Sequence, residues 1–256
     1  MWEGGAGMSA PTHTDPSLTL GMTNSAQAVV SARPMRLFAA LAVFLSASAA
    51  LATTGLPLIE VPATRGASDT MVMFVSGDGG WAAIDKSISR VLADNGMPVV
   101  GLNALQYFWT RRTPESAARD LQWILENYLA SWKKERVLFV GYSRGADVLP
   151  AMISRLPPSL QARTRMVALL GASPKVEFEF HVSDWMRSTS KSGYEVKPEI
   201  EKLTAQRILC LSGEDDKDSL CRMLSGPRIS VVILKGSHHF DGGYEKLANI
   251  ILAHLQ

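Results

Sequence analysis

Three residues of the sequence have the types and the chain order of a nucleophile, an acid and a base. Ser143 lies in the pentapeptide Gly-Tyr-Ser-Arg-Gly at residues 141–145, directly after an apolar run at residues 137–140. A serine hydroxyl is a poor nucleophile at neutral pH, so it needs a base within hydrogen-bond reach and a carboxylate that orients the base. Asp216 and His238 follow in that order. The pattern predicts ester hydrolysis through a covalent serine intermediate.

The sequence leaves alternatives for the base and the acid. His238 is the preferred base because it lies in a Gly-x-His-x-Phe pattern at residues 236–240, which many serine hydrolases have after the last strand; His239 is the alternative. Asp216 is the preferred acid because it stands three residues after Gly213, the usual offset. The same turn contains the alternative acids Glu214, Asp215 and Asp218.

The negative charge of a tetrahedral intermediate requires two backbone N–H donors, which together form an oxyanion hole. By position these are the amides of Arg144, directly after the nucleophile, and of Asp78, in the glycine-rich loop at residues 76–80. An acidic side chain beside an oxyanion is unusual. Either Asp78 caps the helix that begins near Trp81, or it recognises a cationic group of the substrate.

A cluster of aromatic and basic residues lies at residues 106–112, in a predicted loop beside the site. Core packing is the alternative interpretation for its aromatic side chains, and exposure to solvent is the alternative for its arginines. The functional interpretation is a bidentate contact between arginine and a phosphate or lipid headgroup. The predicted substrate-binding residues are Trp81, Tyr107, Trp109, Arg111 and Arg112.

Apolar runs that predict strands alternate with amphipathic segments that predict helices. This alternation implies right-handed crossovers and a mostly parallel sheet with helices on both faces, a three-layer α/β fold. Sites in such sheets lie at the carboxyl ends of the strands. Residues 174–202 have no consistent period and are expected to form a small insertion over those ends. The predicted strands span residues 56–61, 71–75, 97–102, 137–142, 166–170, 207–211 and 229–234.

The first 52 residues are expected to lie outside this domain. Residues 1–34 lack periodicity and are interpreted as a disordered or wrongly assigned extension, with Met35 as an alternative start. Residues 35–52 combine a basic flank, an apolar core and the small-residue end Ala-Leu-Ala of a signal peptide. Residues 53–256 are therefore expected to be one exported domain. An uncleaved membrane anchor is the alternative.

Composition excludes several classes of protein. A formal net charge of +2 gives no signature of nucleic-acid binding. The histidines have no spacing typical of a zinc site, so we predict neither a metal nor a cofactor. Cys210 and Cys221 both fall in the exported part, where an oxidising compartment allows them to pair. We predict a disulfide between them.

Taken together, these motifs resemble the VirJ family of exported bacterial α/β-hydrolases, which includes the C-terminal domain of AcvB proteins. The resemblance covers residues 68–256. It implies an α/β-hydrolase fold and a periplasmic protein, associated in some relatives with virulence and type IV secretion. AcvB-like members are linked to hydrolysis of the aminoacyl ester on lysyl-phosphatidylglycerol. The motifs that carry the resemblance lie at residues 76–81, 107–109, 141–147, 210 with 218–221, and 238–240.

The sequence thus predicts a periplasmic serine hydrolase acting on the aminoacyl ester of lysyl-phosphatidylglycerol or a related lipid. One alternative is a non-catalytic periplasmic protein that interacts with type IV secretion components. Another is a general carboxylesterase or thioesterase. The intact order of Ser143, Asp216 and His238 favours an enzyme, because drift is expected to break a triad that does nothing.

Overall fold

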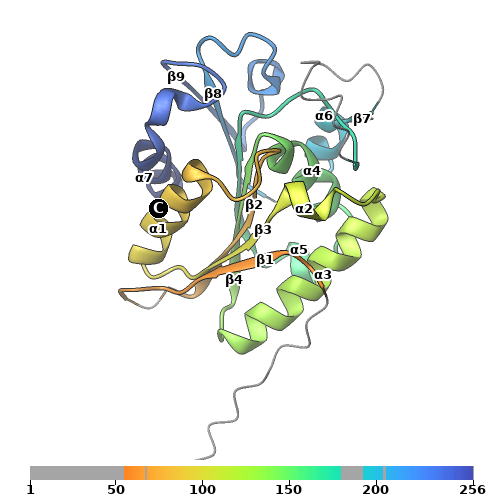
Figure 1. Cartoon of the computed structure of the whole chain (residues 1–256), viewed down its shortest axis with the longest axis vertical. Coiled ribbons are helices and arrows are strands. Elements are labelled where there is room, and N and C mark those ends of the chain that lie inside the picture. The colour runs from red at the N-terminus through yellow and green to blue at the C-terminus, as the bar shows by residue number, and fades with distance from the viewer. Residues whose placement is uncertain (1–54, 67, 180–192, 204–205, 256) are drawn as a thin grey trace, which may run out of the picture. The chain divides into compact units, whose positions relative to one another are not determined.

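The computed structural model describes residues 55–66, 68–179, 193–203 and 206–255. Within them a seven-stranded sheet has the order β1-β3-β2-β4-β5-β8-β9 (Figure 1). Every neighbouring pair in this sheet is parallel except β1 and β3, so the predicted mostly parallel sheet is confirmed. The strands are β1 (Leu58–Val61), β2 (Thr70–Val75), β3 (Val99–Leu102), β4 (Arg136–Tyr142), β5 (Thr164–Leu170), β8 (Ile208–Gly213) and β9 (Ile229–Leu234).

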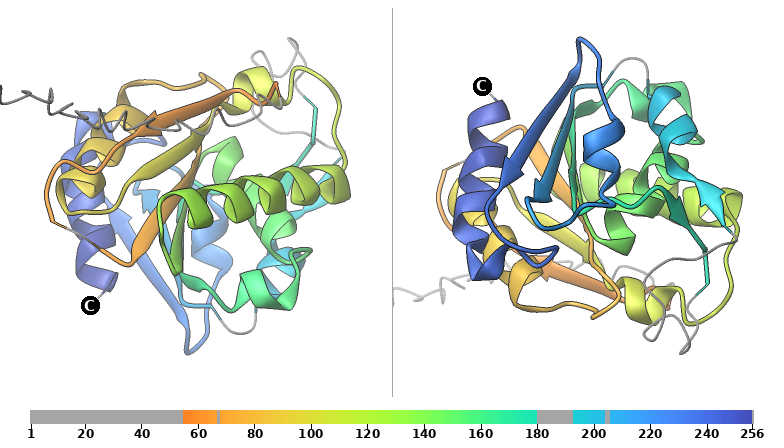
Figure 2. Two further views of the ribbon diagram at one scale, coloured as in Figure 1. Left: turned by 90° about the horizontal axis from the view of Figure 1, so that it is seen from below. Right: turned by 90° about the horizontal axis from the view of Figure 1, so that it is seen from above.

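Helices cover both faces of the sheet, as the two views in Figure 2 show. Helices α1 (Ala83–Asp94) and α7 (Tyr244–Leu255) lie on one face, and α3 (Pro114–Ser131) and α4 (Arg144–Ile153) lie on the other. Side chains of β4 alternate between the two cores: Phe139 packs with α3 and α4, while Val140 packs with α1 and α7. A strand buried on both faces needs apolar residues at successive positions, which explains the unbroken apolar run before Ser143.

Local signals place the start of α3 at Thr113 and Pro114. Thr113 Oγ1 accepts a hydrogen bond from the Ser116 N–H at 3.1 Å, and Pro114 occupies the first turn. A proline there costs no hydrogen bond, because the first N–H groups of a helix have no partner within it. The helix therefore begins at a capped, preorganised end and presents its apolar stripe to the sheet.

One expectation about the elements is wrong in detail. The predicted loop at residues 106–112 begins within the short helix α2 (Ala104–Tyr107), because the Asn103 side chain accepts the Gln106 N–H at 3.3 Å and caps a turn. Helix α4 begins at Arg144, so the nucleophile turn leads straight into the helix.

The predicted insertion at residues 174–202 is described in part. Strand β6 (Lys175–Val176) pairs antiparallel with β7 (Tyr194–Glu195), and α6 (Val196–Glu201) follows. The remaining short elements are α5 (Pro158–Gln161) and the single-turn helices η2 (Leu220–Met223) and η3 (Phe240–Gly242). The predicted extension at residues 1–34 and signal peptide at residues 35–52 lie outside the described residues. In the part of the chain that the structure describes, no helix is both long and apolar enough to cross a membrane.

Helix α1 carries a fully buried carboxyl group, that of Asp85. Its Oδ2 accepts the Ala82 N–H at 2.8 Å, while Oδ1 has no hydrogen-bond partner among the described residues. Burial raises the pKa of Asp85 from 3.8 to about 7. The physical cause is the loss of hydration, which penalises the charged form.

Asp85 should therefore make the folded protein less stable as the pH rises. The folded state keeps a proton that the unfolded chain releases, so the free energy of unfolding falls as the pH increases from 3.8 towards about 7. Asp85→Asn should keep the contact with Ala82 and remove this part of the pH dependence. Thermal melts of both proteins between about pH 4 and about pH 7 measure the difference.

Ser89→Ala is the matched control, because Ser89 is also fully buried on α1 and its hydroxyl likewise has no partner among the described residues. Its removal should shift the melting temperature equally at every pH, since a serine does not titrate in this range. If the melting temperatures of the wild type and Asp85→Asn changed with pH by the same amount, the expected titration of Asp85 would be contradicted.

Candidate active site

The structure brings Ser143, His238 and Asp216 together at the carboxyl ends of β4, β9 and β8. His238 Nε2 lies 3.0 Å from Ser143 Oγ, and His238 Nδ1 lies 2.8 Å from Asp216 Oδ2. The side chains of His238 and Asp216 are 32% and 17% exposed, so the histidine remains accessible while the carboxylate behind it is largely covered. The three groups form one hydrogen-bonded chain with the preferred base in the middle.

The alternative base and acids have other surroundings. His239 Nδ1 lies 2.7 Å from the hydroxyl oxygen of Tyr142, not from Ser143. The Tyr142 ring is nearly buried and lies 5.9 Å from the His238 ring, so it packs beside the base. Among the described residues, Asp216 supplies the carboxylate that contacts His238. The carboxylates of Glu214, Asp215 and Asp218 make no such contact in this part of the chain.

Ser143 occupies a strained turn between β4 and α4. Its φ of 51° and ψ of −120° belong to a region that residues with a side chain rarely adopt. Two glycines require this turn. A Cβ on Gly145 would lie 2.0 Å from the carbonyl oxygen of Val75, and a Cβ on Gly141 would lie 2.5 Å from the carbonyl oxygen of Gly145. Because only glycine allows these approaches, α4 packs directly on β2 and β4 and Ser143 is lifted to the end of the sheet.

The loops that carry the acid and the base pack on each other. Asp215 N–H donates to the carbonyl oxygen of Gly236 at 3.0 Å. A Cβ at Gly213 would lie 2.2 Å from a carbonyl oxygen of the same histidine loop. On the other side, a Cβ at Gly171 would lie 2.9 Å from the ring of His238. Backbone packing therefore sets the distance between the imidazole and its carboxylate.

The side chains of the two predicted oxyanion residues form an ion pair with each other. Arg144 Nε contacts Asp78 Oδ1, with the arginine side chain 9% exposed and the aspartate 36%. The predicted cap of α1 by Asp78 is not formed, because Asp85 accepts the Ala82 N–H at the start of that helix. The carboxylate of Asp78 contacts the Arg144 guanidinium. The backbone of the Asp78 loop still lies against the nucleophile, since a Cβ on Gly77 would be 3.2 Å from Ser143 Cβ.

One buried carboxyl beside this ion pair was not singled out as functional from the sequence. Asp147 is buried on α4 and accepts the Ser173 N–H at 2.6 Å, which fixes the chain after β5. Burial raises the pKa of Asp147 well above its usual range, while the hydrogen bond from Ser173 and the charge of Arg144 act in the opposite direction. The sequence signal was weak, because an aspartate in a first helical turn normally faces solvent.

Comparison with known proteins identifies the family of this chain. The family described as bacterial virulence protein (VirJ) matches residues 69–256. The chain belongs to the VirJ family. No curated protein matches the chain.

Solved structures similar to this VirJ-family protein are α/β-hydrolases of low sequence identity. Est1E from Butyrivibrio proteoclasticus is 10% identical with a TM-score of 0.58, covering 79% of this chain and 94% of that one. The mature lipase BlEst2 from Bacillus licheniformis is 11% identical with a TM-score of 0.56, covering 78% and 98%. An α/β serine hydrolase homologue from Coxiella burnetii is 13% identical with a TM-score of 0.53, covering 78% and 91%. At these identities the likeness shows the α/β-hydrolase fold.

Three of the predicted substrate-binding residues make contacts within the fold. Tyr107 is buried and its hydroxyl donates to Asp120 Oδ2 at 2.5 Å. The Arg112 guanidinium lies over the Tyr107 ring, 4.6 Å from its centroid, and pairs with Asp120 at 3.7 Å. The Trp81 ring fills the space above Gly101, where a Cβ would be 2.3 Å away. Burial of Tyr107 agrees with the alternative of core packing, whereas Trp81 and Arg112 are partly exposed and their contact with substrate stays a prediction.

The other two predicted residues, Trp109 and Arg111, lie on the surface. Trp109 is 64% exposed, and the Arg111 side chain is 82% exposed with Nε 3.6 Å from a carboxylate oxygen of Glu179. They follow α2, next to the described part of the insertion, because the Arg112 N–H donates to the carbonyl oxygen of Phe178 at 2.8 Å. An exposed aromatic ring and a cation thus lie together beside the insertion.

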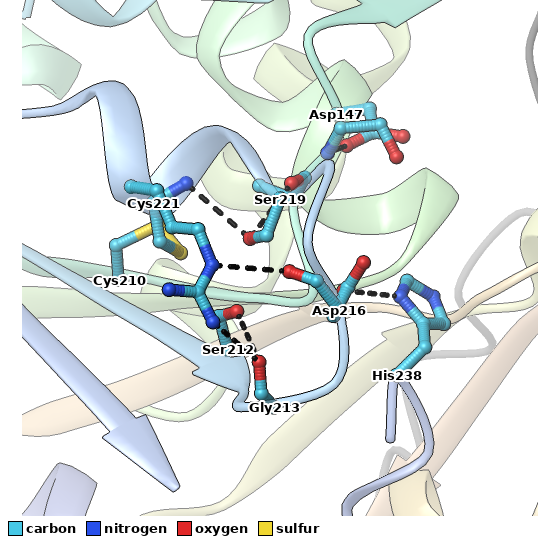
Figure 3. Close-up of a disulfide and its surroundings, with 11 residues drawn as sticks. Asp147, Cys210, Ser212, Gly213, Asp216, Ser219, Cys221 and His238 are labelled. Carbon is cyan, nitrogen blue, oxygen red and sulfur yellow. Dashed lines mark hydrogen bonds and ion pairs between the residues drawn. A yellow bond between two sulfur atoms is a disulfide. The ribbon is translucent and has the colours of Figure 1, made fainter. Parts of the chain in front are cut away.

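The structure joins Cys210 and Cys221 by a disulfide, with a Cα–Cα distance of 5.5 Å. Figure 3 shows the bridge near Asp216, whose carboxylate faces His238. Arg222, next to the bridge, donates from Nη2 to the carbonyl oxygen of Glu214 at 2.8 Å and from Nε to that of Asp216 at 3.3 Å. The bridge and the arginine together hold the acid loop on β8.

Removing the disulfide should destabilise the protein measurably. For a sequence separation of 11 residues, the chain-entropy account gives roughly 3 kcal/mol. We expect this loss of unfolding free energy in a Cys210→Ala, Cys221→Ala double variant, measured by urea denaturation. Hydrogen exchange should rise first at residues 213–218, since Arg222 then loses its anchor. Two free thiols in the unreduced wild-type protein would contradict the bridge itself.

Proposed function

We propose that this VirJ-family protein is a serine ester hydrolase in which Ser143 is the nucleophile, His238 the base and Asp216 the orienting acid. The observation that carries the proposal is the chain of contacts at 3.0 Å and 2.8 Å through the two nitrogens of one imidazole. With Nδ1–H donating to Asp216, the lone pair of Nε2 faces the Ser143 hydroxyl. This is the tautomer that a general base requires.

The geometry supports a two-step reaction. His238 Nε2 takes the proton of Ser143 as Oγ attacks the ester carbonyl, and the oxyanion accepts hydrogen bonds from the backbone N–H groups of Asp78 and Arg144. Collapse breaks the ester bond, and His238 gives its proton to the departing alcohol. Water then attacks the acyl group with the same base, returning free Ser143 and a carboxylic acid.

We further propose that the ester is the aminoacyl ester of lysyl-phosphatidylglycerol or a related lipid, and that the domain works in the periplasm. Family membership supports this, because the AcvB-like relatives are linked to that reaction. Exposed Trp109 and Arg111 support a lipid surface, since an aromatic ring and a cation both suit the headgroup region. Because Asp78 pairs with Arg144, this proposal does not depend on Asp78 recognising a cationic acyl group.

Ser143→Ala and His238→Ala should each abolish labelling by a fluorophosphonate probe in a folded protein. Triad members act as a unit, so each single change should lower kcat by roughly 10⁴-fold or more. Asp216→Asn should lower kcat by roughly 10⁴-fold through the wrong tautomer, whereas Asp218→Asn, the matched control in the same loop, should stay near the wild type. A folded wild-type protein that the probe does not label would favour the non-catalytic interaction protein.

The substrate is tested by comparing vesicles that contain lysyl-phosphatidylglycerol with a soluble neutral ester. Trp109→Ala with Arg111→Ala should raise KM for the vesicles several-fold and leave the soluble ester unchanged, because only the vesicles present a headgroup surface. Arg136→Ala is the control, an exposed arginine at the opposite end of β4. If the protein reacts with the fluorophosphonate probe and cleaves the soluble ester but not the lysyl lipid, the proposed substrate is wrong. The protein would then be a general carboxylesterase or thioesterase.

A further inference from the structure

A buried arginine side chain connects two separate segments next to the nucleophile. Arg144 is 8% exposed, and its Nε contacts the carboxylate of Asp78 in the loop after β2. Its Nη1 donates to the carbonyl oxygens of Glu177 at 2.7 Å and Glu179 at 3.2 Å, in the segment after β6. The residue that follows Ser143 therefore holds both neighbouring segments from a single point.

Both ends of the Asp78 loop are held by the fold. The Ser76 N–H donates to the carbonyl oxygen of Leu102 at 3.1 Å, and the Gly80 N–H donates to the carbonyl oxygen of Gly77 at 3.0 Å. Asp78 lies between these ends, at the tip of the loop. A Cβ on Gly79 would meet nothing within 4 Å, so that side of the loop is open. Glycines on both sides of Asp78 leave its peptide units free to rotate in the absence of a restraint. The ion pair with Arg144 is that restraint.

The guanidinium of Arg144 is suited to holding the Asp78 loop in a fixed position. A guanidinium offers its N–H groups in a rigid planar fork, and three of the contacts of Arg144 use that fork in different directions. A buried charge that loses its partner is strongly unfavourable, so the arginine and the aspartate are expected to stay together. Two oxyanion donors must be in place before charge develops, which requires such a fixed loop.

We propose that the Arg144 side chain is a positioning residue that fixes the Asp78 loop, so that the Asp78 amide is held toward the oxyanion beside the amide of Arg144 itself. This inference rests on the proposed function, because the oxyanion forms only if Ser143 attacks an ester. The role of the side chain is separate from that of the Arg144 backbone, and it acts through Asp78 without touching the reacting atoms.

The chain contains a matched control pair. Arg155, just after α4, pairs with Glu199 of α6 at 2.9 Å, with side chains 26% and 9% exposed. This pair also joins α4 to a neighbouring segment through a largely buried carboxylate. Arg155→Gln should therefore lower the melting temperature as Arg144→Gln does, while leaving both the Asp78 loop and the reaction unchanged.

The experiment measures hydrolysis of a soluble ester, affinity for a boronic acid that mimics the tetrahedral intermediate, and hydrogen exchange at residues 76–81. Arg144→Gln and Asp78→Asn should each lower kcat about 10-fold to 100-fold with little change in KM, since a misplaced donor costs less than a deleted one. The double variant should lose no more than either single variant, because the two residues act as a unit. Arg144→Lys should recover part of the loss.

The outcomes separate this proposal from the proposed function. Faster hydrogen exchange at residues 76–81 in Arg144→Gln, but not in Arg155→Gln, supports the role of Arg144 in fixing the Asp78 loop. This holds even if the wild type cleaves no ester. The proposal is overturned if the wild type is active and Arg144→Gln changes kcat and boronate affinity less than twofold. The same applies if the Arg155→Gln control loses as much kcat, because the effect would then follow stability alone.

Discussion

The close approach of α4 to β2 is the constraint on which the rest of the site depends. At Gly145 the helix backbone lies so near the carbonyl oxygen of Val75 that no side chain fits. This contact forces the chain to turn sharply at Ser143, which accepts a positive φ at some energetic cost. The turn places the hydroxyl above the sheet and the Arg144 amide beside it. The surrounding core, buried on both faces of β4, opposes any relaxation of that strain.

Polar groups inside this domain include an ion pair beside the nucleophile and buried carboxyl groups with raised pKa values. Arg144 and Asp78 form an ion pair next to the nucleophile. Burial of the Asp85 carboxyl raises its pKa to about 7. An unpaired charge near the reacting ester would change the energy of the negative charge that develops there. Because the charges of Arg144 and Asp78 are opposite and adjacent, their combined field at Ser143 is smaller than that of either charge alone.

The acid and the base depend on loops that are secured from outside the sheet. The disulfide and Arg222 hold the loop of Asp216, and the backbone of that loop in turn contacts the loop of His238. Neither loop lies within a helix or strand, so their position relies on these few contacts. Export to an oxidising compartment would therefore bear on the site itself as well as on the stability of the fold.

The sequence by itself determined the elements and the chain order of the chemistry. Apolar runs and glycines are local signals, and they placed the strands and the nucleophile turn. Gly213 gave the offset that selected Asp216 from four acidic candidates in one turn. Each of these inferences needed only neighbours within a few residues, because backbone conformation and helix ends are governed by short-range sterics and hydrogen bonds.

Only the tertiary structure decided which side chains meet. Asp78 and Arg144 are 66 residues apart, and their pairing depends on the parallel alignment of β2 with β4. Tyr107 and Trp109 have the same aromatic character in the sequence, yet one is buried and the other exposed, because α2 turns one side chain toward the core. Sequence periodicity reports burial averaged over an element. The orientation of a single side chain in a short helix or loop is set by contacts with distant segments, which no local pattern contains.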